Sequence, residues 1–258
     1  MTQTIVICSQ KGGVAKTTTC LSLGASLAER GQSVLLIDLD PQANLTLSLG
    51  VDPESLRHTV SDALLEHNSL VAVSREGPMP NLDIVPANQD LVILDKALYG
   101  RQKYESRLKS QLGVLNGDYY NTILIDCPPS FGTLTLNALT AADLLIVPVQ
   151  CEYYAARAMR PVLKLVELVR KKTNPNLAYR VLITMYDRRN KISRIIRDQI
   201  EGAFQSSLFE TIIEIDTKLR ESPTVGLPIN LYAPQTRGAL QYRALAEELA
   251  FDERQRPT

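Results

Sequence analysis

Short apolar runs rich in β-branched residues alternate along the chain with longer helix-like stretches. Such runs, apolar nearly throughout, are typical of strands buried on both faces of a parallel sheet. The runs expected as strands are Thr4–Ile7, Val34–Ile37, Leu82–Val85, Thr122–Ile125, Leu144–Val149 and Arg180–Thr184. This alternation predicts an α/β fold with a doubly wound, mostly parallel sheet and helices on both faces.

The domain organisation follows from the length and from the lack of interruptions. A chain of 258 residues buries enough surface for one large core,. No internal repeat, long linker or low-complexity stretch breaks the pattern, and Gly77–Pro80 is interpreted as a surface turn. Residues 1–258 are therefore expected to form a single domain, whose ligand should lie at the carboxyl ends of the strands.

The first apolar run leads into a glycine loop, SQKGGVAKTTT over Ser9–Thr19, and then into the helix-like stretch Cys20–Ala28. Paired glycines let backbone N–H groups converge on phosphate oxygens, and the N-terminus of a helix adds its positive dipole end. Lys16 is expected to hold the β- and γ-phosphates and Thr17 to ligate Mg²⁺. The expected nucleotide cradle is Lys11, Gly12, Gly13, Val14, Ala15, Lys16, Thr17 and Thr18.

The loop departs from the ordinary P-loop pattern, because Gln10 and Ala15 occupy its two glycine positions,. The remaining pattern, K-G-G-x-x-K-T, resembles the deviant Walker A motif of the ParA/MinD family of P-loop ATPases. The resemblance implies that Lys11 reaches across a homodimer interface to the partner's nucleotide, so that ATP joins the two subunits. The alternative, a glycine-rich turn with two exposed lysines, is disfavoured by the flanking strand and helix.

Two carboxylates, Asp38 and Asp40, follow the second apolar run. Their spacing on an extended segment points both side chains the same way. The segment resembles the family's D-x-D-P-Q motif, which implies that Asp40 positions or activates the attacking water, while Asp38 lies nearer the metal. Taken singly, an aspartate after a strand is more often a turn or a helix cap.

A third carboxylate, Asp126, ends another apolar run and is interpreted as the Walker B residue. Thr17, Asp38 and Asp126 are thus the expected metal site, and Lys11, Lys16 and Asp40 the expected catalytic residues. The implied chemistry is in-line attack of water on the γ-phosphorus, with Mg²⁺ and the two lysines balancing the developing charge. The resemblance further implies that hydrolysis is slow without a partner.

The resemblance continues through the second half of the chain. Pro148–Ala155 is similar to the family's P-x-Q-C-E-Y-x-A segment, and Leu182–Arg189 to the strand and loop that pack near the base. The stretch Leu219–Ile229 is similar to a segment with an S-x-G-x-P-I core. By this resemblance, Met185, Asp187 and Pro234 are expected beside the nucleotide base.

Charge gives a further clue, although 28 basic and 28 acidic residues cancel over the whole chain. Contact with nucleic acid therefore requires local clustering of charge, and basic residues dominate Arg157–Asp198. The resemblance implies non-specific DNA binding by Arg188, Arg189, Lys191, Lys218 and Arg220. A solvated helix face is the alternative, and the acidic Ile213–Asp216 stands where relatives often carry I-P-R-N.

The expected partners are a second copy of the chain, non-specific DNA, and a ParB-like or adaptor protein that stimulates hydrolysis. No apolar stretch is long enough for a membrane span, and Met1 leads directly into a strand,. A cytoplasmic protein is therefore expected, and the DNA binding that the resemblance implies makes it nucleoid-associated.

Two alternatives from other classes stay open. A MinD-like membrane ATPase needs a basic amphipathic C-terminal helix, whereas Leu245–Arg256 is of mixed charge. An electron-transfer or cluster-assembly ATPase needs cysteines that share an iron–sulfur cluster between subunits. Cys127 and Cys151 are the candidates, although buried reduced thiols are the simpler interpretation.

Overall fold

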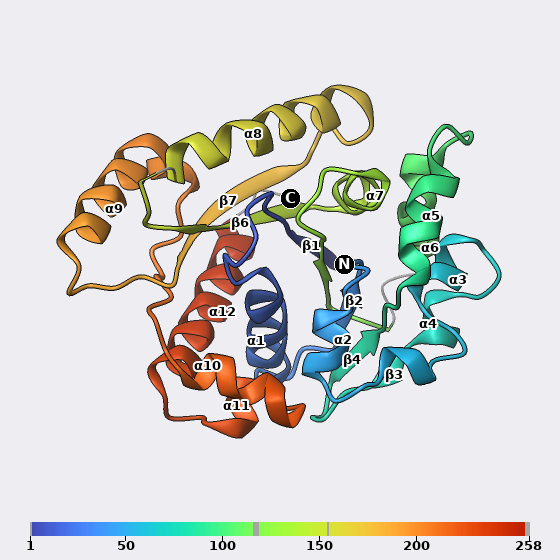
Figure 1. Cartoon of the computed structure of the whole chain (residues 1–258), viewed down its shortest axis with the longest axis horizontal. Coiled ribbons are helices and arrows are strands. Elements are labelled where there is room, and N and C mark those ends of the chain that lie inside the picture. Colours follow the sequence, from blue (N-terminus) through green and yellow to red (C-terminus); the bar gives the residue numbers. More distant parts are fainter. Residues whose placement is uncertain (1, 116–118, 154, 256–258) are drawn as a thin grey trace.

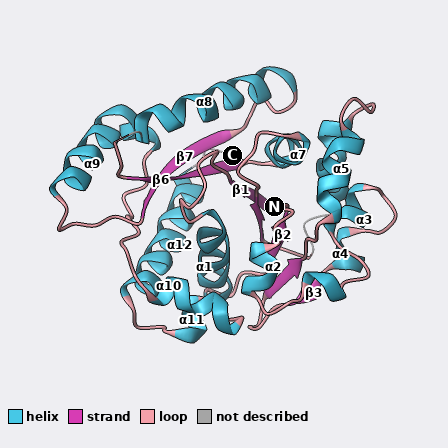
Figure 2. Cartoon of the chain, in the orientation of Figure 1, coloured by secondary structure: helices cyan, strands magenta, loops and turns pink. Residues whose placement is uncertain are grey.

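The computed structural model describes residues 2–115, 119–153 and 155–255, with the backbone alone at 156–158 and 252–255. The described residues form a seven-stranded sheet in the order β3-β4-β2-β5-β1-β6-β7 (Figures 1 and 2). The strands are β1 Gln3–Ile7, β2 Val34–Asp38, β3 Arg75–Glu76, β4 Leu82–Val85, β5 Thr122–Asp126, β6 Leu144–Gln150 and β7 Ala178–Thr184. All neighbouring pairs are parallel except β3 and β4. The predicted fold class is confirmed, as are the six predicted strands.

Helices cover both faces of the sheet (Figure 1). Their bounds are α1 Lys16–Glu29, α2 Asn44–Ser48, α3 Val60–Leu64, α4 Leu70–Val73, α5 Asp90–Leu98, α6 Arg107–Gly113, α7 Thr133–Ala141, α8 Ala155–Lys172, α9 Lys191–Phe204, α10 Lys218–Glu221, α11 Ile229–Tyr232 and α12 Arg237–Gln255. The helix expected over Cys20–Ala28 is α1, which begins at Lys16.

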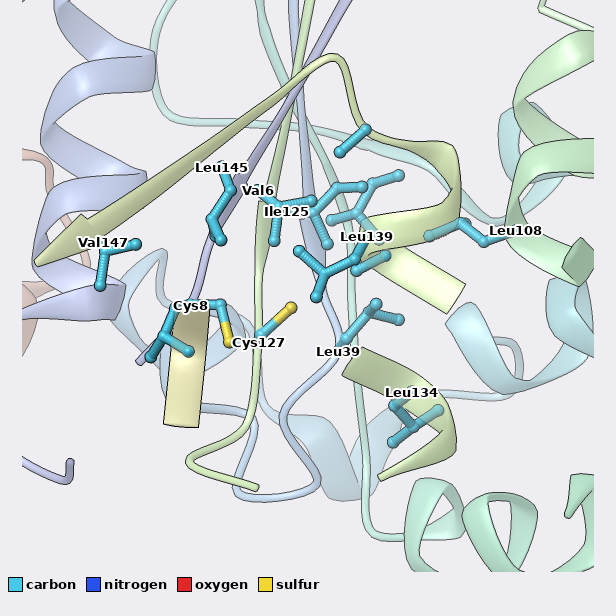
Figure 3. Packing of buried hydrophobic residues seen from close by; sticks show 14 of the residues in the cluster. Val6, Cys8, Leu39, Leu108, Ile125, Cys127, Leu134, Leu139, Leu145 and Val147 are labelled. Atoms are coloured by element: carbon cyan, nitrogen blue, oxygen red, sulfur yellow. The ribbon is translucent and has the colours of Figure 1, made fainter. Parts of the chain in front are cut away.

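The core lies in two layers, because successive strand residues point to opposite faces of the sheet. In β1, Ile5 and Ile7 pack on one face with residues of α1 and α12. Val6, between them, packs on the other face with Leu139 of α7 and Leu145 of β6 (Figure 3). Both layers are closed from water, which explains why the parallel strands are apolar throughout instead of alternating.

The short strand β3 was not predicted from the sequence, for a physical reason. It has two residues, Arg75 and Glu76, and both are exposed. It pairs antiparallel with β4 through the turn that contains Gly77–Pro80. An exposed pair of charged residues carries no hydrophobic period, so only the tertiary pairing defines it as a strand.

The register of the sheet brings three strand ends to one edge. Ile7 of β1 and Asp38 of β2 are both register partners of Asp126 on β5. The glycine loop that follows β1 and the carboxylates that end β2 and β5 therefore lie side by side at the carboxyl edge of the sheet.

Candidate active site

The glycine loop makes the turn from β1 into α1 with two residues in the left-handed conformation. Gly13 has φ 72°, which a glycine adopts without steric cost, and Ala15 has φ 64°,. The methyl group of Ala15 makes this conformation cost about 1 kcal/mol. The Ala15 carbonyl accepts the Thr19 N–H at 2.9 Å. Because no described side chain caps α1, the N–H groups of its first turn are left for an anion.

Side chains at the ends of β6 and β7 hold the loop by its carbonyl groups. The Gln150 amide donates to the Gly13 carbonyl at 2.8 Å, and the Thr184 hydroxyl donates to the Val14 carbonyl at 3.1 Å. With these carbonyls engaged on the sheet side, the loop is fixed before any ligand binds.

The loop opens onto a cavity of about 590 Å³. Predicted site residues that line it are Gly12, Gly13, Ala15, Lys16, Thr17, Thr18, Asp40 and Met185. Arg220, predicted to contact DNA, also lines this cavity. Val14 is buried beneath the loop, and neither Asp187 nor Pro234 is among the described residues that line the cavity, so their placement beside the base stays a prediction.

One wall of the cavity was missed by sequence reasoning. Its residues are Ile213, Glu214, Ile215, Asp216, Leu219 and Tyr242. Backbone bonds from Tyr186 N–H to the Ile213 carbonyl (3.0 Å) and from Ile215 N–H to the Tyr186 carbonyl (3.1 Å) lay this segment beside the end of β7. The available signal was the apolar pair Ile213 and Ile215, two residues apart as on an extended segment.

Asp38, at the end of β2, is fully buried and fully hydrogen-bonded. One oxygen accepts the Asp40 N–H at 3.0 Å. The other accepts the Thr46 N–H at 2.9 Å and the Thr46 hydroxyl at 2.7 Å. Burial raises the pKa of Asp38 to about 6, although these hydrogen bonds act in the opposite direction,. Asp38 thus binds α2 to β2, and its two oxygens are already occupied.

Asp126, at the end of β5, is equally buried but only half satisfied. Its Oδ2 accepts the Thr17 hydroxyl at 2.6 Å, while its Oδ1 is buried without a hydrogen-bond partner among the described residues. Burial first, and then the charge of Asp38, raise the pKa of Asp126 well above its ordinary value. A buried carboxylate oxygen without a partner is costly unless a ligand satisfies it.

The arrangement fits a hydrated magnesium ion. The Thr17 hydroxyl can give a lone pair to a cation while its O–H group donates to Asp126 Oδ2, and Asp126 Oδ1 can accept a hydrogen bond from a metal-bound water,. Within the described residues no group of three or more His, Cys, Asp or Glu side chains is placed to hold a metal. Mg²⁺ at Thr17 would therefore take most of its ligands from water and phosphate, as this ion commonly does.

Asp40, predicted to position or activate the attacking water, lies at the cavity. It lines the cavity, is 7% exposed, and its Oδ1 accepts the Gln42 N–H at 2.9 Å. Its second oxygen is left to act on a ligand or a water in the cavity.

Lys11 and Lys16 behave differently. Lys16 is buried, lines the cavity, and its Nζ lies 3.5 Å from the Lys11 carbonyl. The Lys11 side chain is not part of the cavity lining, and its Nζ contacts Glu152 and Gln150 of the same chain.

Most of the predicted DNA-contacting residues are engaged with carboxylates. Arg189 pairs with Asp187 at 3.1 Å, Lys218 with Glu221 at 2.6 Å, and Arg188 with Glu214 at 3.8 Å. Lys191 is exposed and forms no ion pair with a described residue. Exposed pairs of this kind are weak, so phosphate groups can displace the carboxylates.

The buried cysteines bear on the cluster alternative. Cys127 lies directly after β5 and is completely buried, beside Cys8 in the core (Figure 3). The hydrogen bond with the neighbouring Cys8, and then burial, raise the pKa of Cys127 well above its ordinary value. Cys151 is 6% exposed, and burial raises its pKa to about 11. Neither thiol has the character of a ready metal ligand.

The fold and the glycine loop together define a P-loop nucleoside triphosphatase. Residues 2–179 match the protein family described as an AAA domain. The chain is 41% identical to the sporulation initiation inhibitor protein Soj of Bacillus subtilis over 97% of this chain and 99% of that protein. It is 38% identical to the chromosome partitioning protein ParA of Caulobacter vibrioides over 98% and 95%, respectively. The chain belongs to the family of the Soj and ParA chromosome-partitioning proteins.

Solved structures agree with this assignment of the fold. A cobyrinic acid a,c-diamide synthase of Mycobacterium smegmatis, solved with an ATP analogue and magnesium, superposes with a TM-score of 0.87 at 37% identity, covering 99% of this chain and 97% of that one. The septum site-determining protein MinD of Pyrococcus horikoshii, complexed with Mg-ADP, gives 0.78 at 27% identity, covering 96% of each chain. Across the described part of this chain, no helix combines the length and apolar character needed to cross a membrane.

Proposed function

We propose that this protein is a ParA-type ATPase that binds Mg-ATP at the glycine loop, dimerises around the nucleotide, and binds DNA without sequence preference. Hydrolysis, slow alone and stimulated by a ParB-like or adaptor partner, releases the DNA. The cycle segregates DNA or positions a protein cargo on it, in the cytoplasm at the nucleoid.

The observation that carries the nucleotide part is the pair Thr17 and Asp126 beside the open first turn of α1. Thr17 lines the cavity at the uncapped start of α1, and its hydroxyl donates to Asp126, whose other, buried oxygen has no hydrogen-bond partner among the described residues. A magnesium-bound triphosphate supplies the partners that these groups lack: phosphate oxygens for the N–H groups, and the ion and its waters for the hydroxyl and the carboxylate.

The residues of the chain divide the hydrolytic work. Lys16, buried at the cavity wall, balances charge on the β- and γ-phosphates, and the α1 N-terminus binds their oxygens. Asp40 orients the attacking water from its place on the lining. Magnesium, when bound, supplies further positive charge to the phosphates. The cavity wall formed by Met185, Ile213 and Leu219 is apolar enough to pack against the base.

The DNA part is supported by three exposed cations, one that lines the same cavity, one that pairs with a residue of its wall, and one at the start of α9. Arg220 lines the cavity. Arg188 pairs with the cavity residue Glu214, and Lys191 opens the following helix, α9. A ligand that changes this wall therefore changes the surroundings of the cations, which is how ATP would control DNA binding. The names of the Soj and ParA relatives support a partition role.

The test is binding of the protein to a duplex of arbitrary sequence with ATP, ADP or no nucleotide, at low and moderate salt. Wild type, Lys16→Ala and a matched surface control, Lys109→Ala on α6, are compared. Salt-sensitive binding that requires ATP in the wild type and the control, and is lost in Lys16→Ala, supports the proposal. Nucleotide-independent binding, or dimerisation with ATP but without DNA binding, contradicts the DNA part.

A further inference from the structure

Lys11 makes contacts within its own chain that lie outside the nucleotide cavity. Lys11 belongs to the glycine loop, yet its ammonium group lies against the segment that follows β6. Its Nζ forms an ion pair with Glu152 and donates to Gln150 Oε1 at 3.2 Å. Both acceptors belong to the same chain, so a lysine expected to bind a nucleotide phosphate is already bound.

The side-chain amide of Gln150 is oriented by a donor at its oxygen and an acceptor at its nitrogen. Its oxygen accepts from Lys11, while its nitrogen donates to the Gly13 carbonyl at 2.8 Å and contacts Met185 Sδ at 2.7 Å. An ammonium group requires an acceptor and a carbonyl requires a donor, so only one orientation satisfies both. Gln150 therefore links the position of Lys11 to the glycine loop and to the cavity wall.

We infer that Gln150 and Glu152 are positioning residues that hold Lys11 in the monomer and compete with phosphate for its ammonium group. This inference rests on the proposed function, in which Lys11 contacts the nucleotide bound by the partner subunit. Before that contact forms, Lys11 must leave Glu152. The strength of its intrachain pairing therefore sets the protein concentration at which ATP drives dimerisation.

The expected effect is limited by exposure. The side chains of Lys11 and Glu152 are 39% and 60% exposed, and exposed ion pairs change equilibria by no more than about fivefold. A modest hold suits a group that has to be released on binding.

Two isosteric substitutions on either side of the ammonium group test the inference in opposite directions. Glu152→Gln removes charge and weakens the hold on Lys11. Gln150→Glu adds charge and strengthens it, but it also removes the amide N–H that donates to the Gly13 carbonyl, so this variant is used only for the modification rate of Lys11. The matched control is Glu247→Gln, because Arg30 and Glu247 form an ion pair with similar exposures of 39% and 65%, far from the glycine loop.

The first readout is the rate at which an amine-acylating reagent modifies Lys11, followed by peptide mass spectrometry on the nucleotide-free protein. A bound ammonium group is shielded from the reagent, so Glu152→Gln should raise the rate and Gln150→Glu should lower it, with Glu247→Gln unchanged. Equal rates in all four proteins would overturn the intrachain hold, whatever the function of the protein.

The second readout is the dimer dissociation constant by sedimentation velocity with a non-hydrolysable ATP analogue. Glu152→Gln should dimerise about threefold to fivefold more tightly than wild type, with Glu247→Gln unchanged. Unchanged or weaker dimerisation of Glu152→Gln would overturn the competition. Failure of the wild type to dimerise would instead contradict the proposed function, and the competition with it, while the acylation rates would still decide whether Lys11 is held.

Discussion

β2 and β5 both end in an aspartate at nearly the same place, but the two side chains differ in their hydrogen bonding. Asp38 and Asp126 are register partners on adjacent strands, and both are completely buried. Asp38 accepts three hydrogen bonds from its own chain, while Asp126 accepts one and keeps Oδ1 free of described partners. Asp38 is therefore a structural carboxylate, whereas Asp126 retains a buried acceptor oxygen for a ligand.

The largest effect should follow from removing the incomplete carboxylate. Asp126→Asn keeps the bond from Thr17 but loses the charge that orients metal-bound water. We expect magnesium-dependent ATP affinity to fall about 10-fold to 100-fold, measured by calorimetric titration of ATP at fixed Mg²⁺. Asp126→Asn with wild-type affinity would show that Asp126 does not serve the metal.

The second effect concerns stability and belongs to Asp38. In Asp38→Asn one oxygen becomes an NH₂ group facing a backbone or hydroxyl donor, which leaves buried donors unpaired. We expect the free energy of unfolding to fall by about 2 kcal/mol, measured by urea denaturation at pH 7.5. Asp126→Asn serves as the comparison and should not lose stability, because no described donor faces Oδ1. An equally stable Asp38→Asn would erase the distinction between the two sites.

The smallest expected effect is the pH dependence of the free energy of unfolding, compared between wild type and Asp126→Asn without nucleotide. Burial raises the pKa of both carboxyls, to about 6 for Asp38. The folded state therefore binds protons more tightly than the unfolded state, and these groups make stability fall as pH rises above about 4. Asparagine imitates the protonated form of Asp126.

The free energy of unfolding of Asp126→Asn relative to wild type should therefore grow between pH 5 and pH 7.5. Urea denaturation of both proteins at the two values measures this difference. If the stability difference between the two proteins stays constant or shrinks as pH rises, the pKa of Asp126 is not raised in the folded state.

The features that could be predicted from the sequence are those encoded by a short, local pattern of residues. The strands that lead to the site and the start of α1 follow from apolar runs and from the glycine loop. Lys16, Thr17 and Asp40, which line the cavity, could be predicted as site residues because each follows a strand at a recognisable spacing. The separate states of Asp38 and Asp126 were not visible, since both are simply an aspartate at the end of an apolar run, and Thr46 determines the difference from eight residues away.

The far wall of the cavity shows the same limit more strongly. Ile213–Asp216 reaches the site through backbone bonds to Tyr186, and Tyr242 comes from the last helix, α12. Such contacts join segments that are distant in the chain and have no motif of their own. The contact of Lys11 with Glu152 joins the segments that follow the neighbouring strands β1 and β6, and the glycine loop alone does not indicate that Glu152 is the partner of Lys11.

The most direct test of the account is single-turnover hydrolysis of labelled ATP, measured together with ATP binding, for wild type, Lys16→Ala and Asp40→Ala. The account predicts that Lys16→Ala loses binding, whereas Asp40→Ala binds ATP like the wild type and hydrolyses it about 100-fold more slowly or worse. Hydrolysis by Asp40→Ala at the wild-type rate, or ATP binding unaffected by Lys16→Ala, would contradict it.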